Sequence, residues 1–143
     1  MYSQTTKLLG EVEKTSAFGR DSLTAVMKRI SDPSLERELA RCRSGYSKRA
    51  KAADEMLAAI DDRAGRTPNS VVTFMRAAIK AQLCGGSDSS KAAEMTIQGL
   101  TMGNIKIRRA MSRSTHASPM AMEAAKELCL FQEEYIEKMK KYL

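Results

Sequence analysis

Residues 31–35 read Ser31-Asp32-Pro33-Ser34-Leu35 and separate two long stretches with helical periodicity. Aspartate accepts hydrogen bonds from the free amides at the start of a helix, and proline is tolerated in the first helical turn. The five residues therefore predict that one helix ends and the next begins after a tight antiparallel turn. On both sides of this turn, apolar and small residues recur at the 3.6-residue period of a helix. The first stripe consists of Thr5, Leu8, Leu9, Val12, Ser16, Gly19, Leu23, Val26, Met27 and Ile30, and the second of Leu39, Cys42, Tyr46, Ala50, Ala53, Leu57 and Ile60.

The rest of the chain predicts one short helix and two further long ones. Pro68 opens a shorter apolar segment that Gly85 closes, and we interpret it as a crossover helix between the second and third long helices. Two more helical stripes follow, on either side of a linker at 114–119. They consist of Ala93, Ile97, Leu100, Asn104, Ile107 and Met111, and of Ala121, Ala124, Leu128, Phe131, Tyr135, Met139 and Tyr142.

Length and composition favour one all-α domain. The chain has 143 residues, a net charge of +7 and a hydrophobic share of 43%, which suit one domain with its own core. Aromatic residues make up 5% and Trp is absent, which favours helices over a β-sandwich. We therefore expect residues 1–143 to form a single four-helix bundle with a short crossover helix. One long crossover is the ferritin-like arrangement, and an up-down-up-down bundle is the alternative.

Neither a membrane span nor a secretory signal is expected. No apolar run approaches the roughly 20 residues that span a bilayer, and residues 1–10 lack the basic flank and apolar stretch of a signal peptide. A cytoplasmic location follows as the expectation. Cys42, Cys84 and Cys129 are far apart and form no CxxC pair, which argues against a disulfide framework or a zinc knuckle. We expect reduced thiols that are buried as small apolar residues.

Residues 93–103 read AEMTIQGLTMG, and residues 131–139 read FQEEYIEKM. Together with the turn at 31–35, these stretches resemble segments of a family of small uncharacterised proteins of anaerobic bacteria that fold as ferritin-like helical bundles. The resemblance covers nearly the whole chain. It implies the fold but no activity and no catalytic residue, because a fold does not by itself determine a function.

The histidine content argues against a conventional di-iron centre. Di-iron members of the ferritin-like group take one Glu from each of two helices and a Glu-x-x-His from each of the other two. Here the single histidine, His116, lies in the predicted linker, and Glu-x-x-His does not occur. An atypical carboxylate site at Glu13 and Glu94 is the alternative, although we interpret both as solvated flanks. We therefore expect no catalytic residue, no bound metal and no other cofactor.

A polar or small residue interrupts each long stripe near the middle of its helix. These residues are Ser16, Tyr46, Asn104 and Gln132, and Tyr135 is near enough in the pattern to join them. Buried polar groups need mutual hydrogen bonds, so we predict a neutral polar layer that fixes the helix register or lines a small pocket. Neutral oxygens bind ferrous iron poorly without anionic partners.

Two further features concern contact surfaces. Gly99 and Gly103, four residues apart on the third long helix, predict a strip where another backbone approaches closely, either a helix of the bundle or a second subunit of a homodimer. The second helix carries a basic face opposite its apolar stripe. This basic face consists of Arg37, Arg41, Lys48 and Lys51.

The basic face is interpreted as a solvated surface. Basic residues of this kind bind phosphates non-specifically, but the chain has no helix-turn-helix spacing, aromatic platform or basic tail. Weak nucleic-acid binding is one alternative, and acidic proteins or anionic membrane surfaces are others. The leading hypothesis is a non-enzymatic ferritin-like bundle that acts by protein interaction, including self-association. A metal-binding or oxidoreductase protein with the atypical carboxylate site is the alternative.

Overall fold

The computed structural model describes residues 3–60 and 89–143, and every regular element in these ranges is an α-helix. The helices are α1 (Gln4–Met27), α2 (Pro33–Ala59), α4 (Ser89–Ser112) and α5 (Pro119–Lys140). The prediction of an all-α bundle with four long helices is therefore confirmed. The crossover helix expected between Pro68 and Gly85, and with it Cys84, lies outside the described residues.

Capping side chains determine where α1, α2 and α5 begin. Ser3, Asp32 and Ser118 each accept a hydrogen bond from a backbone amide in the first turn, which satisfies a donor that has no partner within the helix. Pro33 and Pro119 occupy the first helical position, where no amide hydrogen is needed. Helix α2 thus starts at the turn that the sequence predicts, although α1 already ends at Met27.

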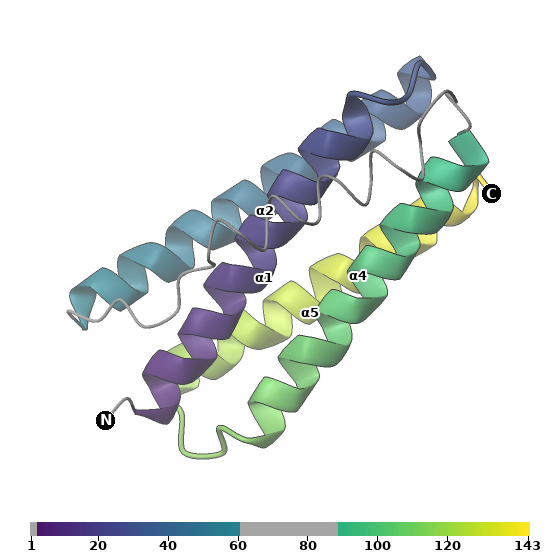
Figure 1. Cartoon of the computed structure of the whole chain (residues 1–143). Coiled ribbons are helices and arrows are strands. Elements are labelled where there is room, and N and C mark those ends of the chain that lie inside the picture. The colour runs from purple at the N-terminus through teal and green to yellow at the C-terminus, as the bar shows by residue number, and fades with distance from the viewer. Residues whose placement is uncertain (1–2, 61–88) are drawn as a thin grey trace.

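The helices form two antiparallel hairpins, α1 with α2 and α4 with α5, which pack against each other (Figure 1). Two hydrogen bonds show which ends meet. The Ser118 amide donates to Thr5 Oγ1 at 2.8 Å, so the connection between α4 and α5 lies beside the start of α1. Ser89 Oγ donates to Asp32 Oδ2 at 3.1 Å, so α2 and α4 start at the same end.

Helices α2 and α4 are consequently parallel, and α2 ends at the opposite end of the bundle from the start of α4 (Figure 1). In an up-down-up-down bundle, each long helix is antiparallel to the next. The parallel directions of α2 and α4 differ from that pattern.

The apolar stripes of all four helices meet in one core. Leu8, Leu39, Ile107, Leu128 and Met139 are completely buried. Burial of such a side chain stabilises the folded state by about 1.5–3 kcal/mol, so the packing of these stripes holds the hairpins together.

None of the four described helices combines the length and the apolar character that a membrane span requires.

Candidate functional site

A chain of hydrogen bonds crosses the interior of the bundle. The Tyr46 hydroxyl of α2 donates to Gln132 Oε1 of α5 at 2.8 Å. The side-chain amide nitrogen of Gln132 donates to Asn104 Oδ1 of α4 at 2.6 Å. Gln132 is completely buried, and its oxygen and nitrogen are both hydrogen-bonded. Three neutral side chains thus join three helices.

The chain continues from Asn104 to the surface. Asn104 Nδ2 donates to Glu133 Oε1 at 3.4 Å, and the Arg108 guanidinium pairs with the same carboxylate oxygen. At the inner end, burial raises the pKa of Tyr46 well above its ordinary value of 10.0. The phenol therefore stays protonated at neutral pH and acts as a hydrogen-bond donor rather than as a base.

Glycines provide the space that these side chains occupy. A Cβ atom on Gly103 of α4 would lie 2.1 Å from Gln132 Oε1, and one on Gly19 of α1 would lie 2.5 Å from the Tyr46 ring. Gly99 differs, because a Cβ atom there would meet nothing within 4 Å. The two glycines of the predicted strip therefore have different surroundings. Gly103 lies at a contact between helices of the bundle, whereas Gly99 is exposed.

Two other residues predicted for the polar layer lie in the interior but have different surroundings. Ser16 is completely buried, and its hydroxyl has no hydrogen-bond partner in the described part of the chain. Tyr135 is buried beside Phe131, with 5.0 Å between the ring centroids. The Lys138 ammonium also lies 4.6 Å from the Tyr135 ring centroid. Tyr135 is thus part of an aromatic cluster.

The two carboxylates considered for an atypical metal site lie apart. Glu94 is exposed and pairs with Lys91 at 3.2 Å. Glu13 is buried, so its interpretation as a solvated flank is wrong. A Cβ atom on Gly103 of α4 would lie 3.3 Å from Thr15 of α1, so these two positions lie side by side on antiparallel helices. With this alignment, Glu13 and Glu94 are about three helical turns apart along the helix axes. Within residues 3–60 and 89–143, no three Asp, Glu, His or Cys side chains gather in a group that could hold a metal.

The remaining polar residues singled out in the sequence lie at the surface. His116 is exposed in the loop between α4 and α5, and its backbone amide donates to Gln4 Oε1 at 2.6 Å. The side chains of the basic face are exposed along α2, and that of Arg41 lies 3.5 Å from Glu38. The members of this face are Arg37, Arg41, Lys48 and Lys51.

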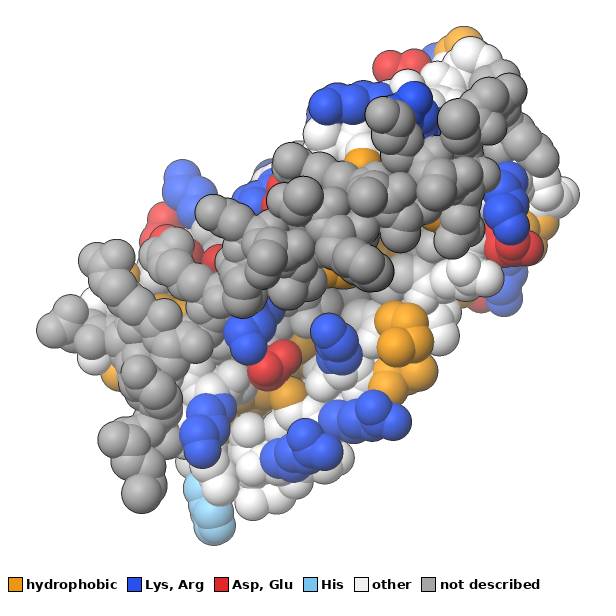
Figure 2. Space-filling view, viewed as in Figure 1, with side chains coloured by type: hydrophobic (Ala, Val, Ile, Leu, Met, Phe, Trp, Pro, Cys, Tyr) orange, Lys and Arg blue, Asp and Glu red, His pale blue; other side chains and the backbone are white. Residues whose placement is uncertain are grey.

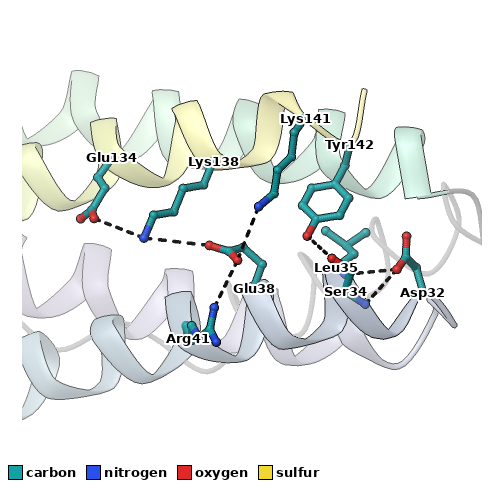
Figure 3. A network of polar contacts seen from close by, with 9 residues as sticks. All are labelled: Asp32, Ser34, Leu35, Glu38, Arg41, Glu134, Lys138, Lys141 and Tyr142. Atoms are coloured by element: carbon teal, nitrogen blue, oxygen red, sulfur yellow. Dashed lines mark hydrogen bonds and ion pairs between the residues drawn. The ribbon is translucent and has the colours of Figure 1, made fainter.

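Glu38 is a buried carboxylate that the sequence analysis did not single out. It lies where α2 meets α5 (Figure 3), within 3.5 Å of Arg41 and 4.0 Å of both Lys138 and Lys141. Lys138 also pairs with Glu134 at 3.2 Å. The sequence spacing could have indicated that Glu38 is buried, because residue 38 lies three positions after buried Leu35 and therefore on the same side of the helix.

Cys42 and Cys129 are free and buried. Burial raises the pKa of the Cys42 thiol to about 12, and the nearby Glu38 carboxylate acts in the same direction. Burial also raises the pKa of Cys129. Neither thiol is activated as a nucleophile.

A groove of about 1210 Å³ runs between α1 and α4. Residues from Gln4 to Val26 line one side and residues from Met95 to Ser114 line the other, while Tyr46 and Gln132 also reach it. The helical stripes did not indicate this groove, because periodicity identifies apolar faces but not which helices become neighbours.

Comparisons with family models, curated proteins and solved structures found no match to this chain. The features of the chain that bear on function are therefore the polar layer, the surface of α4 and the groove beside it.

Proposed function

We propose that the protein is a ferritin-like bundle that acts by protein interaction rather than by catalysis. The hydrogen-bonded chain of Tyr46, Gln132 and Asn104 carries the proposal. Metal-binding ferritin-like proteins project carboxylates and histidines into the bundle core from facing helices. In this chain a phenol and two amides occupy the interior and bond to one another, and such neutral groups bind ferrous iron poorly.

The order of the helices supports the ferritin-like part of the proposal. Helices α2 and α4 start at the same end, as the 3.1 Å hydrogen bond between Ser89 and Asp32 indicates. Two antiparallel hairpins joined by one long crossover are the arrangement of ferritin-like bundles.

The outer face of α4 is the interaction surface in this proposal. Met102 and Ile105 are large apolar side chains with 54% and 37% of their surface exposed. Met102 lies about one helical turn from Gly99, and Ile105 lies about one turn beyond Met102. At Gly99 the absence of a side chain lets another backbone approach closely. We propose a second copy of the chain as the partner, with the two α4 helices antiparallel.

Charge along α4 supports an antiparallel pair of this kind. Glu94 lies near the start of the helix, and Lys106 and Arg109 lie towards its end. When two copies meet near Met102 in opposite directions, the basic end of each helix faces the start of the other, where Glu94 is paired with Lys91, so the two basic ends lie apart. This arrangement is isologous and therefore closes as a dimer.

Sedimentation equilibrium over a concentration series tests self-association. We expect a monomer–dimer equilibrium, and Ile105→Glu is expected to raise the dissociation constant at least tenfold. Leu130→Glu is the matched control, because Leu130 is 65% exposed but lies on α5. A chain that stays monomeric at every concentration, or equal weakening by both substitutions, would contradict the proposed dimer.

A further inference from the structure

The groove between α1 and α4 has two chemically different halves. Thr15 and Gly103 face each other near its middle. Towards the start of α1 and the end of α4, exposed cationic side chains line it: Lys7, Lys106, Arg109 and Arg113. Towards the other end, its lining is mainly apolar: Phe18, Leu23, Val26, Met95 and Leu100. The two halves meet where the Lys106 ammonium lies 5.9 Å from the Phe18 ring centroid.

Positive charge in the basic half exceeds the negative charge near it. Among the residues that the structure describes, Glu11 is the acidic residue that lines the groove, and it already pairs with Lys14 at 3.4 Å. In the described part of the chain, no carboxylate lies within ion-pair distance of the four cations Lys7, Lys106, Arg109 and Arg113. Lys and Arg side chains gather along α4 on the face shown in Figure 2, beside an exposed hydrophobic patch.

The dimensions of the groove suit an extended ligand. Its lining covers 23 positions of α1, from Gln4 to Val26, and at 1.5 Å per residue each half is about 16 Å long. Gly99 widens the apolar half, since a Cβ atom there would meet nothing within 4 Å. The shape is that of a narrow apolar trough with a cationic end.

We propose that this groove binds a single-chain amphiphile with an anionic head, namely a long-chain fatty carboxylate. The carboxylate would lie beside Lys106 and Arg109, where charge-assisted hydrogen bonds are available. From there the alkyl chain would extend past Phe18 of α1 towards Leu100 of α4. A rim that is purely apolar would favour a neutral ligand, and a groove that is cationic throughout would favour a polyanion. The ligand site goes beyond the proposed dimer. The two surfaces share Gly99, Met102, Lys106 and Arg109, whereas Ile105 does not line the groove, so Ile105→Glu tests the dimer without changing the ligand site.

Titration calorimetry of the full chain with dodecanoate, below the concentration at which dodecanoate forms micelles, tests the cationic half. We expect saturable binding of about one ligand per chain, and the double substitution Lys106→Glu and Arg109→Glu is expected to weaken it at least tenfold. Lys48→Glu with Lys51→Glu makes the same change in net charge on the far side of α2 and is expected to leave the affinity unchanged. Equal weakening by the two pairs would mean non-specific attraction and would overturn the proposal.

The length of the alkyl chain tests the apolar half. Affinity is expected to rise roughly fourfold for each added methylene group between octanoate and dodecanoate, because each group leaves water. Gly99→Phe is expected to remove this dependence by filling the trough, and Gly99→Ala is the control for the loss of glycine. Dodecyltrimethylammonium is expected to bind at least tenfold more weakly than dodecanoate. Absence of saturable dodecanoate binding, or binding to anionic phospholipid vesicles alone, would overturn the assignment.

Discussion

Tyr46 and Gln132 lie 86 residues apart in the chain and share a 2.8 Å hydrogen bond in the interior. Gln132 also donates to Asn104, so one side chain joins α5 to both α2 and α4. A slide of any of these helices along its neighbours would leave buried polar atoms without partners, which is costly in a low-dielectric interior. The network therefore fixes the register of the bundle.

Removal of the Tyr46 hydroxyl tests the energetic importance of this network. Tyr46→Phe is expected to lower the free energy of unfolding by about 1–3 kcal/mol, because Gln132 Oε1 loses its donor while it remains buried. Urea denaturation followed by circular dichroism measures the change. Ser16→Ala is the matched control, since the Ser16 hydroxyl is buried without a hydrogen-bond partner in the described part of the chain. Its removal is expected to leave stability unchanged or raise it, and equal losses from both substitutions would contradict this assignment.

Substitution of alanine for the two glycines of α4 is expected to change the free energy of unfolding in opposite directions. Gly103→Ala places a Cβ atom 2.1 Å from Gln132 Oε1, so we expect a loss of about 1–3 kcal/mol in the free energy of unfolding. Gly99→Ala meets nothing within 4 Å and is expected to raise stability by up to about 1 kcal/mol, because alanine favours helix. Thermal and urea denaturation of the two variants provide the comparison. Stabilisation by Gly103→Ala would show that Gln132 does not occupy this space.

Glu38 is expected to matter more for stability than its neighbour Glu134. The Glu38 side chain is 9% exposed and faces three cations, whereas that of Glu134 is 59% exposed. Glu38→Gln is therefore expected to lower the free energy of unfolding by about 1–3 kcal/mol. Glu134→Gln is expected to lower it by at most about 1 kcal/mol, as is usual for surface ion pairs. Urea denaturation at low salt distinguishes the two, and the reverse order would contradict the description of this contact.

The Cys42 thiol is expected to resist alkylation in the folded protein. With a pKa of about 12, raised mainly by burial, little thiolate exists at pH 8, and the thiolate is the reactive form. Iodoacetamide treatment followed by peptide mass spectrometry is expected to modify Cys42 only after denaturation. Rapid modification under native conditions would show that the thiol is neither buried nor raised in pKa.

The stabilisation that Asp32 provides as the N-cap of α2 is expected to depend on pH. The Leu35 amide, which donates to its carboxylate, lowers the pKa of Asp32 below the ordinary value of 3.8, and the Ser89 hydroxyl acts in the same direction (Figure 3 shows the amide contacts). Because the folded state lowers the pKa, Asp32 stabilises the fold above the unfolded-state pKa. This stabilisation is lost as the pH falls through the lower folded-state pKa.

The melting temperature of Asp32→Ala tests this linkage. It is expected to lie below that of the wild-type protein at pH 7, and the difference is expected to shrink towards pH 2. A difference that is constant across this range would show that the charge of Asp32 does not contribute.

The helices could be predicted because their causes are local. The cap at Asp32 and the spacing of apolar residues depend on neighbours within a few positions. Asn104 and Gln132 were recognised as interior residues because they occupy stripe positions. That Gln132 bonds to both Tyr46 and Asn104 depends on contacts across 86 and 28 residues, which periodicity does not specify.

Other features could not be predicted from the sequence, because they also depend on contacts between helices. The spacing of Gly99 and Gly103 predicts one contact strip, but Gln132 of α5 lies against Gly103 and not against Gly99. Glu38 lies on the apolar side of α2, and its burial depends on lysines that α5 brings near. The groove exists only once α1 and α4 are neighbours.

The metal content of the untagged protein tests most directly whether neutral side chains replace a metal centre in this bundle. The protein is incubated aerobically with ferrous iron and manganese, loosely bound ions are removed, and metal per chain is determined by mass spectrometry. We predict no stoichiometric metal, because the interior side chains Tyr46, Gln132 and Asn104 bond to one another. Retention of about one or two metal ions per chain would contradict this conclusion and direct attention to the buried carboxylates.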